Sequence, residues 1–129
     1  MFWPRDIPDR VPGLQETLAA WDGCVWQLES YGMSHPTFTL WVYGKGRPTS
    51  LKIYCAMPRY IRGPTGWNGC QFTVRAQDAK PLGYLVIRDD SADFEIRCFH
   101  IHTEERPPPH WLAPVSAGGH GGEGAAARD

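Results

Sequence analysis

Hydrophobic and polar residues alternate with a period of two along most of the chain. In the segment 37–43, for example, Phe38, Leu40 and Val42 fall on one side. Successive side chains of a strand point to opposite faces, so this alternation predicts strands with one face in a core and the other in solvent. We expect six strands, near residues 24–31, 37–43, 50–57, 69–76, 83–88 and 93–102.

One segment before these strands has the period of a helix instead. Leu14, Leu18 and Trp21 recur at the spacing of a single helical face. Pro12 lies near the expected start and Gly23 lies just beyond the expected end, which is the usual placement of these two residues around a helix. The pattern therefore predicts a short helix over about 13–21.

Turn-forming residues separate the predicted strands, and strands this short indicate an antiparallel meander, a sandwich or a partly open barrel. With one N-terminal helix, the expected class is α+β, mainly β. We expect an extended N-terminal arm over 1–12 and a single β-rich domain over 13–115. The tail over 116–129 contains no aromatic or branched aliphatic residue, so we expect it to be disordered in isolation.

Length and composition narrow the class of protein. The chain has 129 residues, 42% of them hydrophobic, and a formal net charge of −1. Its longest apolar runs have four residues, whereas a membrane-spanning helix needs about twenty. We therefore expect no membrane partner, and the absence of a secretory signal predicts a cytoplasmic location. In a reducing compartment the four cysteines should be buried thiols. They are Cys24, Cys55, Cys70 and Cys98.

Charge is unevenly distributed along the sequence. The segment 45–88 contains eight basic residues and one acidic residue, and both flanking segments have an acidic excess. Lys52, Tyr54 and Arg75 fall on the polar sides of two predicted strands, and cations beside aromatic rings suit single-stranded nucleic acid or another polyanion. In the alternative, the acidic strand around 93–95 pairs with the basic strands across the sheet.

The segment around Cys98, His100 and His102 is a second candidate site. On one strand these residues would project to the same face, where a thiol and two imidazoles could bind a metal ion. The two imidazoles could also act as acid and base in a small hydrolase. Alternatively, the strand leaves the core at Cys98 and both histidines lie in solvent. No common catalytic motif is found, and we expect no cofactor.

The six tryptophans are many for this length. Trp26, Trp41 and Trp67 fall at polar positions or in loops, and Arg59 and Arg62 lie shortly before Trp67. Exposed Trp and Arg are enriched in protein interfaces, so these five residues are predicted to bind a partner protein. In the alternative, the rings form a second small core.

The order of elements resembles that of small immunity proteins from bacterial polymorphic toxin systems. These have a short helical start, a Trp-Asp or His-Asp motif leading into the first strand, and an antiparallel run of strands. The resemblance covers about residues 14–103 and rests on Trp21-Asp22-Gly23-Cys24-Val25, Leu51-Lys52-Ile53-Tyr54-Cys55, Trp67-Asn68-Gly69-Cys70 and Asp93-Phe94-Glu95-Ile96-Arg97-Cys98. It implies a non-catalytic cytoplasmic inhibitor that blocks a cognate toxin by surface complementarity. Our leading hypothesis is therefore a protein-interaction module, either an immunity-type inhibitor or a subunit of a larger assembly.

Overall fold

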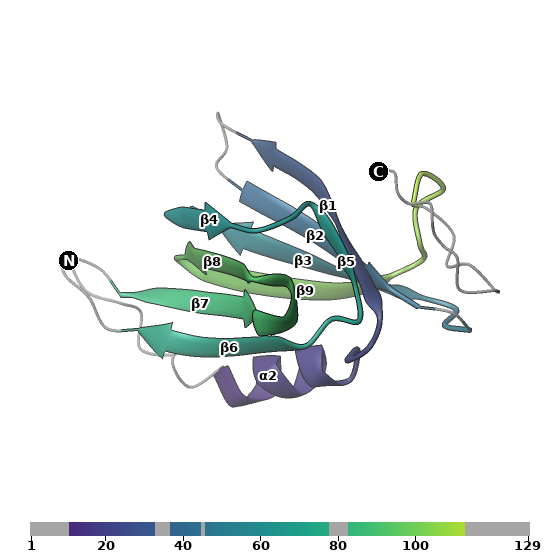
Figure 1. The fold of residues 1–129 in the computed structure, drawn as a ribbon, viewed down its shortest axis with the longest axis horizontal. Coiled ribbons are helices and arrows are strands. Elements are labelled where there is room, and N and C mark those ends of the chain that lie inside the picture. Colours follow the sequence, from purple (N-terminus) through teal and green to yellow (C-terminus); the bar gives the residue numbers. More distant parts are fainter. Residues whose placement is uncertain (1–10, 33–36, 45, 78–82, 113–129) are drawn as a thin grey trace.

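The computed structural model describes residues 11–32, 37–44, 46–77 and 83–112 (Figure 1). The predicted arm over 1–12 lies outside these ranges except for its last two residues, which are helical. The predicted tail over 116–129 lies outside them altogether. No helix in the described ranges is both long enough and apolar enough to cross a membrane.

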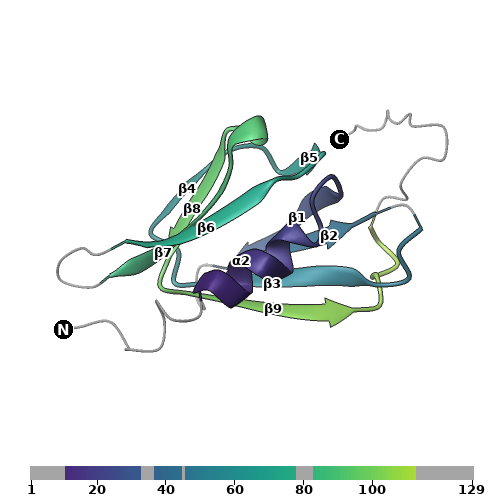
Figure 2. The same cartoon turned by 90° about the horizontal axis from the view of Figure 1, so that it is seen from below.

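Two antiparallel sheets lie one above the other (Figure 2). The first has the strand order β5-β1-β2-β3-β9 and consists of β5 (Gly66–Asn68), β1 (Val25–Gly32), β2 (Thr37–Tyr43), β3 (Ser50–Ala56) and β9 (His100–Arg106). The second has the order β4-β8-β7-β6 and consists of β4 (Tyr60–Arg62), β8 (Phe94–Cys98), β7 (Tyr84–Asp89) and β6 (Phe72–Gln77). The predicted class, α+β and mainly β, is confirmed, and the architecture is a sandwich without a closed barrel.

The helix α2 (Val11–Ala19) begins and ends two residues earlier than predicted. Pro12 lies in its first turn. Backbone N–H groups there have no carbonyl acceptor within the helix, so the N–H that proline lacks costs no helical hydrogen bond. The helix runs beside β6 at the edge of the second sheet (Figure 1). There the Gln15 side chain donates to Phe72 O at 3.1 Å and accepts from Val74 N at 2.8 Å. Gln15 thus occupies the backbone groups that an edge strand otherwise exposes.

The strand expected over 93–102 is two strands in different sheets. β8 ends at Cys98, β9 begins at His100, and the chain passes from one sheet to the other at Phe99. Phe99 N donates to Ala56 O at 2.9 Å, which joins the crossing point to the first sheet. Two three-residue strands, β4 and β5, were also not predicted, because the intervening Gly and Pro residues are typical of turns. A short 3-10 helix, η1 (Asp90–Ala92), links β7 to β8.

Aromatic side chains fill the space between the sheets. The ring of Trp26 lies 4.5 Å from that of Phe94 and 6.0 Å from that of Phe72, measured between centroids. Cys55, Cys70 and Cys98 belong to the same core, which confirms their predicted burial, while Cys24 is only partly buried. All four are free thiols.

Candidate functional site

Two of the three tryptophans predicted to bind a partner are buried. Trp26 is fully buried and its Nε1 donates to Asp89 Oδ2 at 3.3 Å. It shares the inner face of β1 with Leu28, so its prediction as a partner-binding residue is wrong. Trp41 lies on the outer face of the first sheet, where its Nε1 donates to Glu29 Oε1 at 2.6 Å. It is buried there against the edge of Trp111, so it offers a partner little surface.

The residues predicted to bind a polyanion do not form one surface. Lys52 and Tyr54 lie on the outer face of β3 in the first sheet, whereas Arg75 lies on the outer face of β6 in the second. Lys52 is occupied within the chain, because its Nζ lies 3.7 Å from Glu29 Oε1 and 4.8 Å from the Tyr54 ring centroid. The prediction failed because period-two alternation does not reveal which sheet a strand joins.

Cys98, His100 and His102 do not converge either. Cys98 points into the core from β8, while the two histidines alternate with buried Ile101 on β9 and therefore face outward. The crossing at Phe99 separates the thiol from both imidazoles. In the described ranges, no three His, Cys, Asp or Glu side chains are grouped so that they could hold a metal ion. The predicted shared face, and with it the metal site, is wrong.

The outer face of the second sheet carries a group of arginines that the sequence only partly indicated. Each of the four strands contributes one, and a fifth precedes β4. We call this surface the arginine face, and its arginines are Arg59, Arg62, Arg75, Arg88 and Arg97. Arg88 and Arg97 were not singled out from the sequence. On β8, the period-two alternation of Glu95 and Arg97 with buried Phe94, Ile96 and Cys98 would have placed Arg97 outward.

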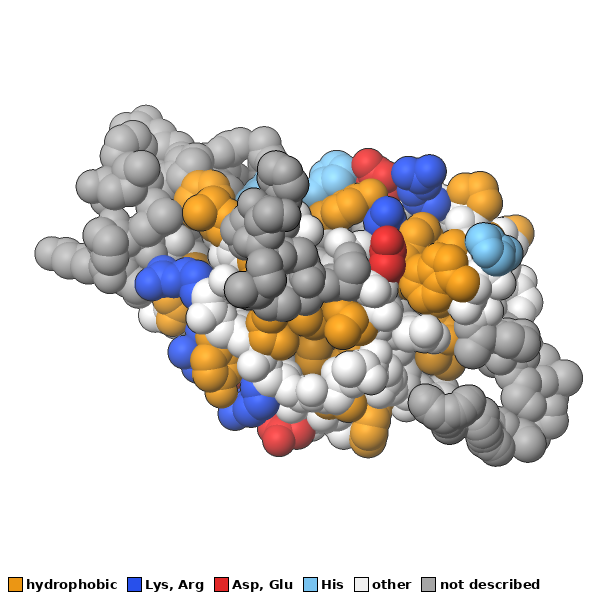
Figure 3. Space-filling view, turned by 90° about the horizontal axis from the view of Figure 1, so that it is seen from above, with side chains coloured by type: hydrophobic (Ala, Val, Ile, Leu, Met, Phe, Trp, Pro, Cys, Tyr) orange, Lys and Arg blue, Asp and Glu red, His pale blue; other side chains and the backbone are white. Residues whose placement is uncertain are grey.

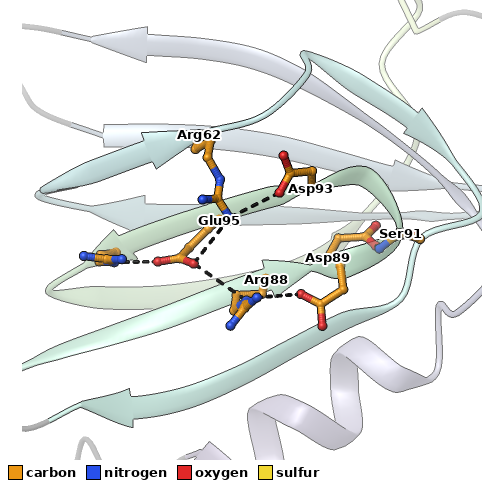
Figure 4. Close-up of polar contacts among 8 residues, drawn as sticks. Arg62, Arg88, Asp89, Ser91, Asp93 and Glu95 are labelled. Atoms are coloured by element: carbon orange, nitrogen blue, oxygen red, sulfur yellow. Dashed lines mark hydrogen bonds and ion pairs between the residues drawn. The ribbon is translucent and has the colours of Figure 1, made fainter.

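Glu95 lies at the centre of the arginine face and is only 5% exposed. Its carboxylate is 2.5 Å from Arg97 Nε, 3.7 Å from Arg88 Nε and 3.9 Å from Arg62 Nη2 (Figure 4). Burial alone would raise the pKa of Glu95, but the hydrogen bond from Arg97 and the charges of all three arginines lower it below its ordinary value. Glu95 is therefore a carboxylate at neutral pH and draws the three guanidinium groups together.

Two further carboxylates lie at the rim of the arginine face. Asp93 Oδ1 is 3.3 Å from Arg62 Nη2, and Asp90 Oδ1 is 2.9 Å from Arg88 Nη2 (Figure 4). Together with the Glu95 contacts, these pairs confirm the alternative in which the acidic strand around 93–95 matches the basic strands. Part of the charge asymmetry in the sequence is thus neutralised within the fold.

The two tyrosines of this face are covered by arginines. The guanidinium carbon of Arg97 lies 4.3 Å from the Tyr60 ring centroid, and that of Arg59 lies 5.2 Å from the Tyr84 ring centroid. Both distances fit cation–π contacts. Each ring therefore has an arginine on one of its faces, although Tyr60 stays partly exposed.

Asp89 lies behind the arginine face and is fully buried. Its Oδ2 accepts from Trp26 Nε1 and from Gln71 N, both at 3.3 Å. Its Oδ1 accepts from Ser91 N at 3.1 Å and from Ser91 Oγ at 2.5 Å. Both oxygens are occupied, so this carboxylate links the two sheets and caps η1 rather than facing a ligand.

An exposed apolar surface adjoins the arginine face. Of five exposed large hydrophobic side chains among the described residues, four lie within 57–68. We call these four the apolar edge: Met57, Tyr60, Ile61 and Trp67. Figure 3, which views the molecule from above, shows hydrophobic side chains gathered between two groups of charged side chains.

The backbone of the apolar edge is held by both sheets. β4 pairs with β8 and β5 pairs with β1, while Thr65 O between them accepts from Leu28 N at 2.8 Å. Gly63 has φ +131°, and a Cβ there would lie 2.8 Å from Phe94 Cα, so only glycine fits this approach. Three of the residues predicted to bind a partner, Arg59, Arg62 and Trp67, are close in sequence and lie within this segment.

Comparisons with models of protein families, with curated protein sequences and with solved structures found no match to this chain.

Proposed function

We propose that this chain is a non-enzymatic protein-interaction module that binds another protein through the apolar edge. The observation that carries the proposal is the grouping of four exposed large hydrophobic side chains within residues 57–68. Single exposed hydrophobic residues are ordinary on protein surfaces, whereas a group of them beside polar residues is typical of a binding surface.

The residue types and the rigidity of the segment support the same proposal. Trp, Tyr, Met and Arg are enriched in interfaces, and all four types occur between Met57 and Trp67. Because strand pairing on both sides already holds the backbone, binding would order little additional chain. A partner would therefore meet a surface whose shape is largely set in advance.

The partner's identity defines two forms of this proposal. In the first the chain is an immunity-type inhibitor of a cognate toxin, as the resemblance implies. In the second it is a subunit of a larger assembly. We also propose a cytoplasmic location, which the four free thiols support.

Trp67 and Trp111 make a matched pair for the test. Their exposed fractions are 40% and 41%, but only Trp67 lies on the apolar edge. The tagged chain and its Trp67→Ala and Trp111→Ala variants would be used to capture partners from a native lysate treated with nuclease. We expect one protein in stoichiometric amount with the unmodified chain and with Trp111→Ala, and its loss with Trp67→Ala.

Equal recovery with both variants would contradict the proposal, as would recovery that depends on intact nucleic acid. Circular dichroism would establish that each variant is folded. The inhibitor form of the proposal also predicts that an equimolar amount of the chain abolishes a toxic activity of the captured protein.

A further inference from the structure

We infer that the arginine face binds acidic side chains of the partner protein, so that the partner presents a run of Asp or Glu residues beside the part that covers the apolar edge. The inference rests on the proposed function and names the chemistry of its partner. Tyr60 and Arg62 lie on β4, which belongs to both surfaces, so one partner can cover both.

The charge balance of the arginine face favours an acidic ligand. Among the described residues, five arginines share this face with three carboxylates, those of Asp90, Asp93 and Glu95. Glu95 is buried and stays with its arginines, but Asp90 and Asp93 are largely exposed, and ion pairs between exposed groups are weak. Carboxylates of a partner can therefore replace Asp90 and Asp93 beside their arginines and can also pair with the excess positive charge of the arginine face.

The hydrogen-bonding capacity of these arginines is only partly used. A guanidinium group has five N–H donors, and Glu95 approaches each of three arginines through one nitrogen. Arg88 Nε is buried without a hydrogen-bond partner, so a ligand can meet only the outer nitrogens of this guanidinium group. Since Glu95 holds the three groups in place, their free edges are arranged in advance for the paired contacts that arginine makes with carboxylates.

Two features favour an acidic polypeptide over a nucleic acid. Bases stack on open aromatic faces, but the rings of Tyr60 and Tyr84 each already have an arginine, Arg97 and Arg59 respectively, on one face. The adjoining apolar edge fits the mixed surface of a protein better than a charged strand. Binding of nucleic acid is therefore the competing outcome of the test.

The test compares two probes of equal charge on the full chain. A fluorescent glutamate-rich peptide and a fluorescent single-stranded oligodeoxythymidine would be titrated at one ionic strength and followed by anisotropy. Arg62→Gln and Arg88→Gln change the proposed site. Arg106→Gln is the matched control, since Arg106 lies on the other sheet and is 52% exposed against 46% for Arg62. Each of these two arginines lies 3.3 Å from a carboxylate.

We expect the peptide to bind more tightly than the oligonucleotide. Each substitution in the face should weaken peptide binding by about tenfold, the usual effect of losing a charged hydrogen bond, and Arg106→Gln should leave it unchanged. Tighter oligonucleotide binding that is lost in Arg62→Gln would overturn the inference in favour of nucleic acid. Absent peptide binding, or equal binding by Arg62→Gln and Arg106→Gln, would also overturn it. Partner capture that depends on Trp67 could still be observed after either of these last two outcomes. The inference can therefore fail while the proposed function stands.

Discussion

Glu95 organises the arginine face, and its replacement by glutamine should lower the free energy of unfolding by about 2 kcal/mol. A hydrogen bond to a charged group contributes about 1.5–3 kcal/mol, and Glu95 receives one from Arg97 Nε at 2.5 Å. Glutamine keeps the shape and one acceptor oxygen, which limits the loss. Solvent also screens the repulsion among the three partly exposed guanidinium groups. For a domain of this size, 2 kcal/mol corresponds to a fall in Tm of roughly 10 °C.

The effect of this substitution should depend on pH in one direction. The arginines lower the folded-state pKa of Glu95 below the ordinary value of 4.5, despite the opposing effect of burial. A carboxylate with a lowered folded-state pKa contributes its full stability above the unfolded-state pKa and loses it as the pH falls through the folded-state value. The difference between the unmodified chain and Glu95→Gln should be constant above about pH 5.5 and shrink below about pH 4.5.

Urea denaturation followed by tryptophan fluorescence would measure this difference across the pH range. Glu16→Gln is the control, because Glu16 is exposed on helix α2, and a change there should stay within about 0.5 kcal/mol. The reasoning would be refuted by a Glu95→Gln variant as stable as the unmodified chain at neutral pH. It would equally be refuted by a loss of stability that persists undiminished in acid.

Three further predictions concern the core and the backbone. Trp26→Phe should lower the free energy of unfolding by about 2–3 kcal/mol in urea denaturation, because it leaves a cavity and removes a hydrogen bond from buried Asp89. Gly63→Ala should destabilise the chain by about 1–3 kcal/mol in the same assay, whereas Gly13→Ala, which meets open space in helix α2, should stabilise it by about 0.5 kcal/mol. In native protein at pH 8 a thiol reagent should modify Cys24 first and the buried thiols only after unfolding; rapid modification of the native core would contradict this. Burial raises the pKa of Cys70 to about 12, so its thiol stays protonated at that pH.

Local patterns were sufficient to predict most strands and the fold class, because alternation within a strand depends on neighbouring residues alone. Phe38, Leu40 and Val42 lie in the core as their spacing predicts. The same pattern cannot show which sheet a strand joins. Phe99 carries the chain between sheets, and the alternation changes phase there, because Cys98 and Phe99 are adjacent apolar residues and Ile101 follows in the opposite phase. This single residue separates Cys98 from the two histidines.

The candidate site was predictable only where exposure followed from local sequence. Arg62 and Trp67 lie in a segment rich in Gly and Pro, and the structure leaves both exposed as expected. Trp26 was misplaced although the local pattern favours burial, because Trp26 and Leu28 alternate with Gln27 and Glu29 along β1. Lys52 and Arg75 were grouped wrongly for a different reason, since strand order and not spacing puts them on opposite faces of the sandwich.

The edges of the two sheets suggest how a partner is recognised. Gln15 occupies backbone groups of β6, and β4 and β5 have only three residues each. β9 is longer, but it carries charged residues and is followed by three prolines, which discourage further strand pairing. Addition of a partner strand by backbone hydrogen bonds is therefore disfavoured at β4, β5, β6 and β9. We therefore expect a partner to be recognised mainly through side chains, and the apolar edge and the arginine face expose such side chains.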